Sequence, residues 1–453
     1  MGQSVHATQP RRLSAPRSWV IGLRLWVIAA LVGLAVGVAV IFMRLAILGG
    51  EFFFFNASHE QVATAARDLP WQTLLVAPVV GGSIVGMLLW LGKNSGWGDA
   101  PRSFGVAEVM AARRSPKKLT DATLSVRDGL LSAAIAGVSL SSGSSTGREG
   151  PAVHLGAMIS SLPSRWLKLD IRATRTLIGC GAAAAVSASF HAPLAGLLFA
   201  REVVLQRYRI ADIGPVAVSS VVAALAARAH FGEDSIFPPP DLSETPLSFF
   251  LITPLMGCLA AGLALVAIWT WIEAPKAGER LADRTGLPVW ALPPLGGFAI
   301  GALALAFPQI LGVGYEATAS AIAGAYQPLF LIVLVIAKLA ATAISLGSRF
   351  GNGVFSPSIY LGAMIGGAFG AAAGLALGDF ETGRTFFTIV GMGAVSGAVL
   401  GAPISTTLIV FELTASYETA AAVLVSVSLA TVLVQGVGGA IFERQLRIRM
   451  RER

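Results

Sequence analysis

Charged residues are scarce in this chain. Asp, Glu, Lys and Arg make up only 13% of its 453 residues, whereas 55% are hydrophobic. Soluble globular domains contain about a quarter charged residues, so the composition excludes an ordinary soluble enzyme or binding domain. The hydrophobic residues fall into runs close to the ~20 residues that a membrane-spanning helix needs. The sequence therefore predicts an all-α polytopic membrane protein.

Cysteine and histidine are also rare, with two and five copies. Cys180 and Cys258 lie in hydrophobic segments, where we expect small buried side chains and neither a disulfide framework nor a metal site. His154 and His191 stand alone beside predicted helix starts, which favours packing over a proton relay. No Ser-His-Asp, metal-ligand or His-Asp acyl-transfer pattern is present. An enzyme is therefore the last of three functional hypotheses, and we expect no metal and no cofactor.

The net charge of +8 comes from basic residues in short loops between the hydrophobic runs. Such loops remain in the cytoplasm, so the pattern predicts a multi-pass protein of the bacterial inner membrane with both termini cytoplasmic. No basic patch interleaves with aromatic residues. Membrane lipid is therefore the expected partner, and nucleic acid is not.

The chain is predicted to form one membrane domain between two short tails. Residues 1–18 form a polar cytoplasmic tail, residues 19–439 the transmembrane domain, and residues 440–453 a basic cytoplasmic tail, with too few residues left for a soluble regulatory domain. The first span is predicted to end near Gly49–Gly50. A later hydrophobic run is interrupted at His191–Ala192–Pro193, which predicts a pair of short helices.

One short motif, Gly147–Arg148–Glu149–Gly150–Pro151, stands between two hydrophobic segments. Its glycines allow a close backbone approach, and Pro151 suits the first turn of a helix. A helix N-terminus carries about half a positive charge and attracts anions. Glu149 can occupy the anion's place and leave it when protonated or displaced, which describes a gate. The alternative is a structural capping carboxylate, but an ionisable residue beside a membrane span favours a functional role.

Two parts of the chain recur in the same order, 206 and 210 residues apart. Repeats of this kind, frequently inverted, are common in membrane transporters, and the repeat halves here are about 74–245 and 287–439. The two halves then bring two helix N-termini together near the middle of the membrane. The first match pairs Gly147, Pro151 and Leu155–Ile159 with Gly353, Pro357 and Leu361–Ile365, and the second pairs Gly181, Ala192–Pro193 and Glu202 with Gly391, Ala402–Pro403 and Glu412.

The repeat also aligns single residues of the first half with single residues of the second half. Glu149 aligns with Phe355, so only the first half places a carboxylate at its helix start. Glu202 and Glu412 are equivalent to each other and lie at predicted helix ends. That placement favours structural hydrogen bonding or ion pairing over gating charges or a proton relay.

With these motifs in order, the sequence resembles the CLC family of chloride channels and proton/chloride exchangers. Gly147–Pro151 is similar to the family's second signature, and Gly353–Pro357 to its third, of the form G-x-F-x-P. The chain looks most like the small bacterial members described as voltage-gated chloride channels. The resemblance implies many tilted and broken helices, and a homodimer with one pore per subunit.

The same resemblance implies roles for particular residues. Glu149 would be the gate, and chloride the transported ligand. The anion would be held where the two helix starts meet. The residues implied there are Gly147, Arg148, Glu149, Gly150, Val354 and Phe355, chiefly through their backbone amides. Ser103 and Phe442 are the further candidates for the lining of the anion site.

Three departures from the family pattern bear on the mechanism. The serine of the family's first signature is displaced to Ser103, with Phe104 in its place, and the C-terminal tyrosine that faces the anion aligns with Phe442. The inner proton-accepting glutamate of many exchangers corresponds to Val203. An apolar residue there is the pattern of channels. We therefore expect a chloride channel gated by voltage or by protonation of Glu149, with a proton-coupled chloride (or fluoride) antiporter as the alternative.

Overall fold

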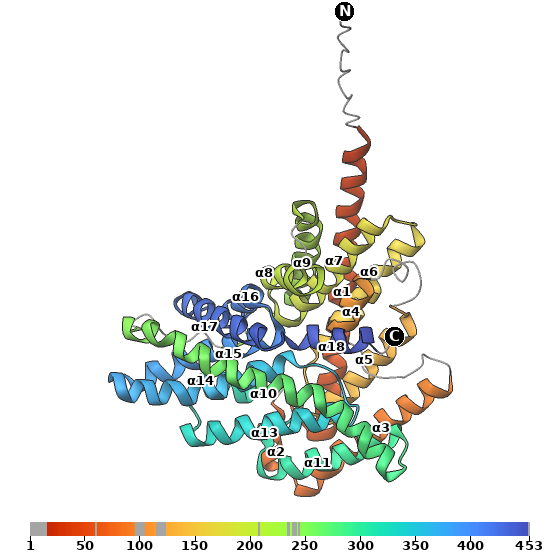
Figure 1. The fold of residues 1–453 in the computed structure, drawn as a ribbon. Coiled ribbons are helices and arrows are strands. Elements are labelled where there is room, and N and C mark those ends of the chain that lie inside the picture. Colours follow the sequence, from red (N-terminus) through yellow and green to blue (C-terminus); the bar gives the residue numbers. More distant parts are fainter. Residues whose placement is uncertain are drawn as a thin grey trace, which may run out of the picture.

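The computed structural model describes residues 16–58, 61–95, 105–114, 124–206, 209–232, 236–237, 242 and 245–451. Within these residues every regular element is a helix, which confirms the all-α prediction (Figure 1). Most of the predicted N-terminal tail and Ser103 lie outside the described residues.

The α-helices are α1 (Pro16–Phe55), α2 (Val62–Asp68), α3 (Trp71–Asn94), α4 (Val106–Arg114), α5 (Val126–Ser141), α6 (Glu149–Trp166), α7 (Ile171–Phe190), α8 (Pro193–Phe199), α9 (Ile210–Phe231), α10 (Leu247–Thr285), α11 (Leu292–Ala306), α12 (Tyr315–Ile322), α13 (Pro328–Gly347), α14 (Phe355–Leu377), α15 (Phe380–Leu400), α16 (Pro403–Thr414), α17 (Tyr417–Gly436) and α18 (Ile441–Arg451). One π-helical turn and two short 3-10 turns complete them: η1 (Ala200–Leu205), η2 (Val289–Ala291) and η3 (Pro308–Ile310).

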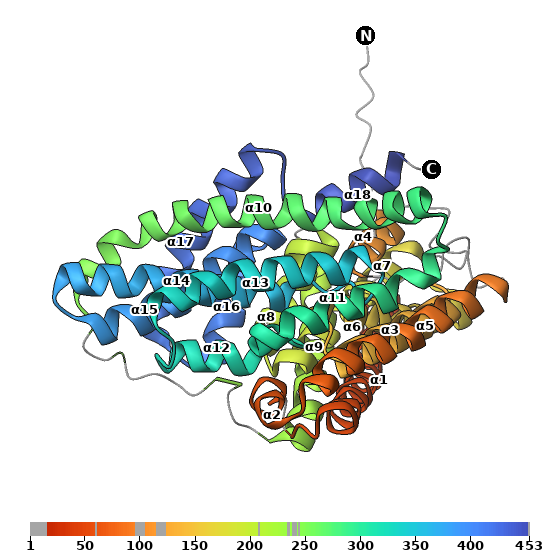
Figure 2. The same ribbon diagram turned by 90° about the horizontal axis from the view of Figure 1, so that it is seen from below.

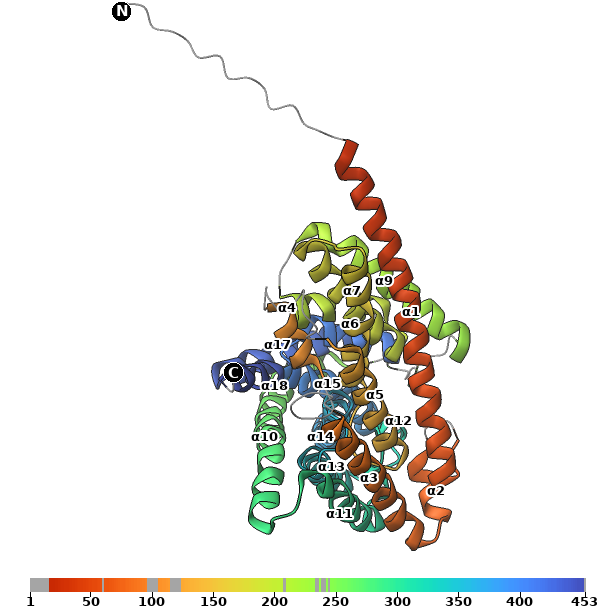
Figure 3. The ribbon, with the colours of Figure 1, turned by 90° about the vertical axis from the view of Figure 1, so that its right-hand side faces the viewer.

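The helices are apolar enough for a membrane. In the described part of the chain, nine helical segments have the length and composition of membrane spans. The two longest helices, α1 and α10, lie on opposite sides of the molecule, with α6, α14 and α15 between them (Figures 2 and 3). Side chains such as Leu251 and Leu255 on α10 are exposed, as expected for a surface that contacts lipid.

Two sequence predictions about the outer helices are wrong. The first span does not end at Gly49–Gly50 but continues in α1 to Phe55. Gly50 instead provides room for a neighbouring helix, because a Cβ there would lie 2.2 Å from the Ser141 hydroxyl of α5. Cys180 is buried as expected, but Cys258 is exposed on α10. A hydrophobic run does not reveal which of its faces contacts lipid.

The end of the chain is packed against the rest of the molecule. Residues 441–451 of the predicted basic tail form α18, in which Phe442 and Leu446 are buried. Arg449 on α18 forms an ion pair with Glu108 on α4. The basic C-terminal segment therefore contributes side chains to the interior.

The internal repeat is visible in helix packing. In the first half, α6 and α7 touch where a Cβ on Gly156 would lie 2.4 Å from the carbonyl oxygen of Gly181. In the second half, α14 and α15 touch where a Cβ on Gly362 would lie 2.2 Å from the carbonyl oxygen of Gly391. The two glycine pairs are the equivalent positions of the sequence repeat. Small residues permit such close helix contacts in membranes, so the repeat preserves a packing geometry.

Two glutamates join the halves reciprocally. Glu202, in the first half, accepts hydrogen bonds from the backbone N–H groups of Ile404 (3.1 Å) and Ser405 (2.8 Å) at the start of α16. Glu412, in the second half, accepts them from Leu194 (3.2 Å) and Ala195 (2.8 Å) at the start of α8. Each carboxylate thus satisfies the free N–H groups of the other half's helix. The structural hydrogen bonding predicted for both residues is therefore present.

The glycine contact between α14 and α15 leads to a stability prediction. We expect Gly362→Ala to lower the thermal unfolding temperature in detergent, because the added methyl group meets backbone atoms and overpacking costs about 1–3 kcal/mol. Gly262→Ala on α10 is the control, since nothing lies within 4 Å of its added Cβ. Equal melting temperatures for the two variants would contradict the packing argument.

Candidate functional site

The starts of α6 and α14 meet at a backbone contact between the two halves. The N–H of Gly147 donates a hydrogen bond of 2.8 Å to the carbonyl oxygen of Gly353. A Cβ on Gly353 would lie 1.8 Å from the Gly147 oxygen, and one on Gly150 would lie 2.6 Å from the Asn352 oxygen. Backbone atoms cannot rotate aside as side chains do, so these positions require glycine. The predicted convergence of two helix N-termini is therefore present.

Glu149 is the first residue of α6, and its side chain is only 4% exposed. One carboxylate oxygen, Oε1, accepts hydrogen bonds from the hydroxyls of Tyr315 (3.3 Å) and Ser356. These two hydroxyls are also 3.2 Å from each other. Two neutral donors, one at the start of α12 and one at the start of α14, therefore hold the carboxylate.

The other carboxylate oxygen of Glu149, Oε2, is buried and has no hydrogen-bond partner among the described residues. It lies against Gly147, where an added Cβ would be 2.3 Å away. Leaving a buried acceptor unsatisfied costs about 1–3 kcal/mol. The carboxylate thus occupies a position that it can leave without losing bonds at this oxygen.

A cavity of about 10 Å³ is bordered by Glu149 and has room for one water-sized particle. We call it the phenylalanine cavity. Glu149, Gly150, Val354, Phe355 and Phe442 all line it, so it brings together five of the residues predicted from the sequence. Its remaining lining residues are Val106, Val186, Phe190, Phe199, Asn352 and Leu400.

A second cavity of about 10 Å³ lies by Tyr315 and is lined by the Arg148 side chain, Glu51, Gln309, Gly312 and Glu316, among others. We call it the arginine cavity. The Arg148 guanidinium lies 5.4 Å from the centre of the Tyr315 ring. Glu149 borders the phenylalanine cavity and bonds to Tyr315, which borders the arginine cavity. Glu149 and Tyr315 thus connect the borders of the two cavities.

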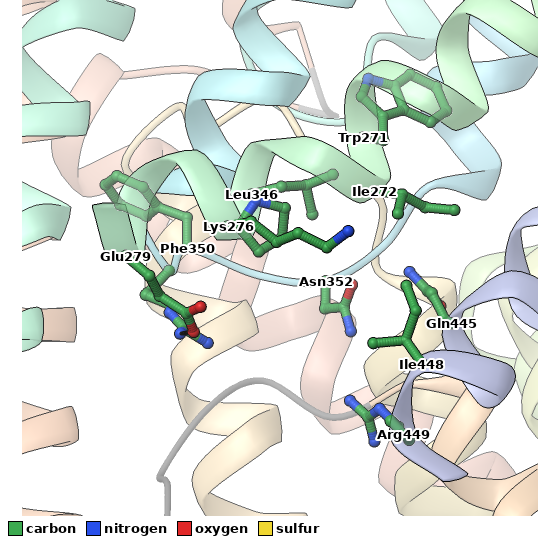
Figure 4. Close-up of a pocket in the computed structure, with 12 residues that line it drawn as sticks. Trp271, Ile272, Lys276, Glu279, Leu346, Phe350, Asn352, Gln445, Ile448 and Arg449 are labelled. Carbon is green, nitrogen blue, oxygen red and sulfur yellow. Dashed lines mark hydrogen bonds and ion pairs between the residues drawn. The ribbon is translucent and has the colours of Figure 1, made fainter. Parts of the chain in front are cut away.

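A larger cavity of about 160 Å³ opens between α10, α18 and the segment before α14 (Figure 4). We call it the basic cavity, because it is lined by Lys276, Arg349 and Arg449. Each of these cations pairs with a carboxylate: Lys276 with Glu273 at 2.6 Å, Arg349 with Glu279, and Arg449 with Glu108. Asn352 lines both this cavity and the phenylalanine cavity, so this residue stands between the two spaces.

The remaining predicted residues have different positions. Gly147 forms the backbone crossing and lines neither of the two small cavities. Val203 is buried in the π-helical turn η1 and also lines neither of them. Ser103 lies outside the described residues.

Sequence reasoning missed Tyr315 and Ser356. Ser356 lies inside the Gly353–Pro357 motif, so its hydroxyl was a usable signal. Tyr315 follows a break at Gly312–Gly314, and nothing in its neighbourhood indicates a contact with a residue 166 positions earlier.

Comparison with known proteins gives the family. The sequence model of the voltage gated chloride channel family matches residues 81–435. The chain belongs to this family, the CLC family. Among curated relatives, a ClcB-like chloride channel protein of Ralstonia nicotianae is 33% identical over 395 residues, which cover 86% of this chain and 89% of the relative. The voltage-gated ClC-type chloride channel ClcB of Escherichia coli is 31% identical over 411 residues, covering 90% and 94%.

Solved structures show the same fold at lower sequence identity. A slow cyanobacterial Cl⁻/H⁺ antiporter superposes with a TM-score of 0.81 and 23% identity, covering 95% of this chain and 99% of that chain. A CLC-type fluoride/proton antiporter superposes with a TM-score of 0.74 and 17% identity, covering 95% and 98%. These structures support the CLC-type arrangement of tilted and broken helices.

The contact between Gly147 and Glu149 leads to a structural prediction. In Gly147→Ala, the added methyl group takes the space of Oε2, so we expect the carboxylate to swing away from Tyr315 and Ser356. An experimental structure of the variant measures this displacement, and Gly137→Ala, with nothing within 4 Å of its Cβ, is the control. A carboxylate that keeps both hydroxyl bonds in Gly147→Ala would contradict the expectation.

Proposed function

We propose that this protein is a channel that conducts anions, chiefly chloride, and that Glu149 is its gate. The observation that carries the proposal is the buried Glu149 carboxylate at the point where the starts of α6 and α14 meet. The chloride-channel names of its curated relatives support the choice of ion. The proposed function is transport rather than catalysis, and it requires no cofactor.

The gating mechanism follows from the charges at this point. The free N–H groups of two helix starts favour a negative charge between them, and the carboxylate of Glu149 provides that charge when the pore is closed. Protonation or displacement of the carboxylate leaves the place to a permeating anion. The backbone amides of Arg148, Glu149, Gly150, Val354 and Phe355 are the proposed ligands, with Phe442 in the wall of the cavity.

Voltage acts on the same group. Moving one elementary charge through the membrane field contributes about 2.3 kcal/mol per 100 mV. A carboxylate that swings between the phenylalanine cavity and the arginine cavity carries such a charge through part of this field, and the corresponding part of that energy acts on the gate. Membrane potential and pH are therefore two ways to shift the same equilibrium.

The alternative function is proton-coupled chloride or fluoride exchange. A single buried carboxylate with two hydroxyl partners can carry protons, and this favours the alternative. The inner proton site of exchangers corresponds to Val203, which is apolar and buried. We therefore place channel conduction first.

The proposal includes the surroundings of the pore. We infer a multi-pass protein of the bacterial inner membrane with both termini in the cytoplasm, in line with the basic loops and the bacterial relatives. We also infer a homodimer with one pore per subunit, as the family resemblance implies.

The first functional prediction concerns Glu149 itself. Glu149→Gln removes the charge that competes with the anion, so we expect chloride efflux from liposomes at neutral pH to rise several-fold and to lose its dependence on pH. Glu381→Gln, at an exposed carboxylate on α15, is the matched control and should behave as the parent. A parental flux and an unchanged pH response in Glu149→Gln would refute the gate.

The second prediction concerns the two hydroxyls. A donor that bonds to a carboxylate stabilises its ionised form. A hydrogen bond to a charged group contributes about 1.5 kcal/mol, which corresponds to about one pH unit. We therefore expect Tyr315→Phe and Ser356→Ala each to move the flux–pH profile about one unit toward higher pH. Tyr417→Phe, at an exposed tyrosine, should leave the profile in place, and an unshifted profile in both test variants would contradict the assignment.

A further inference from the structure

A fully buried lysine lies near the gate, and the mechanism above does not use it. Lys338 is in the middle of α13 and has 0% exposed surface. Its amine donates hydrogen bonds of 2.9 Å to the carbonyl oxygens of Ile310 and Gly312, and it lies 5.1 Å from the centre of the Tyr360 ring. Lysines are almost never fully buried unless they are paired, and charges within membrane spans are functional candidates by default.

The two carbonyls belong to the segment that leads into Tyr315. Gly312 and Gly314 both have left-handed backbone conformations, with φ of +61° and +92°. Glycine adopts these conformations readily but also leaves them readily. The N–H groups of Ile310 and Leu311 donate hydrogen bonds of 3.1 and 3.2 Å within the preceding turn. The N–H of Gly312 donates to the carbonyl oxygen of Gly143, and this bond is long at 3.4 Å. The amine of Lys338 thus fixes a loop that is intrinsically easy to deform.

The loop transmits its position directly to the gate. A Cβ on Gly314 would lie 3.2 Å from the Lys338 amine, and the next residue is Tyr315, the first residue of α12. Tyr315 in turn donates to Glu149. A displacement of the loop by less than 1 Å is enough to lengthen that hydrogen bond beyond bonding distance, because the bond is already 3.3 Å.

We propose that Lys338 is a positioning residue for the gate. Its amine holds the carbonyls of Ile310 and Gly312 and so sets the position of Tyr315, which determines how firmly Glu149 is held. This inference rests on the proposed function of Glu149. It assigns to Lys338 an action through the loop and not a direct contact with the anion.

A direct electrostatic effect of the lysine charge on Glu149 is the competing explanation. Other charged and titratable groups surround the same path: Glu51 on α1, Arg148 before α6, Glu316 on α12 and Tyr360 on α14. A direct charge effect does not need the Tyr315 hydroxyl. An effect through the loop needs it, so the two explanations differ in a Tyr315→Phe background.

The experiment measures chloride efflux against pH for the parent, Lys338→Met, Tyr315→Phe and the double variant. We expect Lys338→Met to shift the half-maximal flux to about tenfold lower proton concentration, in the same direction as Tyr315→Phe. The double variant should match Tyr315→Phe alone. Lys338→Arg should recover most of the parental profile, since a guanidinium can donate to both carbonyls.

Three outcomes would overturn the inference. One is a parental pH profile in Lys338→Met while Tyr315→Phe is shifted. Another is a full additional shift in the double variant, which would assign the effect to charge alone. The third is a Lys338→Arg profile that equals that of Lys338→Met. The pH response is expected to be lost in Glu149→Gln. If the pH response persists in that variant, the proposed gate fails and not the inference about Lys338, so the two failures are distinguishable.

Gly314→Ala extends the test to a variant that keeps the lysine. The substitution strains the loop at φ +92° and places a Cβ 2.7 Å from the Tyr360 ring, so it moves the loop without removing the charge. We expect the same shift toward higher pH, again absent in the Tyr315→Phe background. If Lys338→Met does not fold, the comparison of Gly314→Ala alone with Gly314→Ala in the Tyr315→Phe background decides. An unshifted Gly314→Ala profile would overturn the inference.

Discussion

The close approach of the starts of α6 and α14 is the constraint on which the rest of the structure depends. The hydrogen bond between Gly147 and Gly353 leaves no room for a side chain on Gly353, and it brings two sets of free N–H groups to one place. The glycine pairs between α6 and α7 and between α14 and α15 allow a close helix contact at equivalent positions in both halves. The repeat thus preserves the packing behind the proposed anion site.

The symmetry of the halves ends at Glu149, the proposed gate. Equivalent positions carry Glu149 in one half and Phe355 in the other, so only one helix start has a carboxylate that can be protonated. Its partners are neutral hydroxyls, which bond to the carboxylate without the strong attraction of a cation. Such a carboxylate is held yet remains able to move, as a gate requires. The equivalent pair Glu202 and Glu412 instead binds helix N-termini through two bonds each, which suits a fixed structural role.

The sequence predicted the features that local patterns determine. Hydrophobic runs identified the membrane helices, and the recurring glycines and prolines identified the repeat, the convergence and the position of Glu149. It did not predict Tyr315 or Lys338, because their contacts join segments far apart in the chain. The exposure of Cys258 and the continuation of α1 beyond Gly49–Gly50 depend on which helix packs against which face. Ser356 lies in the Gly353–Pro357 motif, whose family pattern fixes only the glycine, phenylalanine and proline. Its contact with Glu149 was therefore not predicted.

The most direct test of this account is a measurement that distinguishes a channel from an exchanger. The measurement is proton movement during chloride efflux from liposomes that contain the purified protein, with valinomycin setting the voltage. The account predicts chloride flux without proton movement against a gradient, because the buried, apolar Val203 stands where the family resemblance implies the inner proton site. Stoichiometric proton uptake coupled to chloride efflux would contradict it and would require a proton route that avoids this residue.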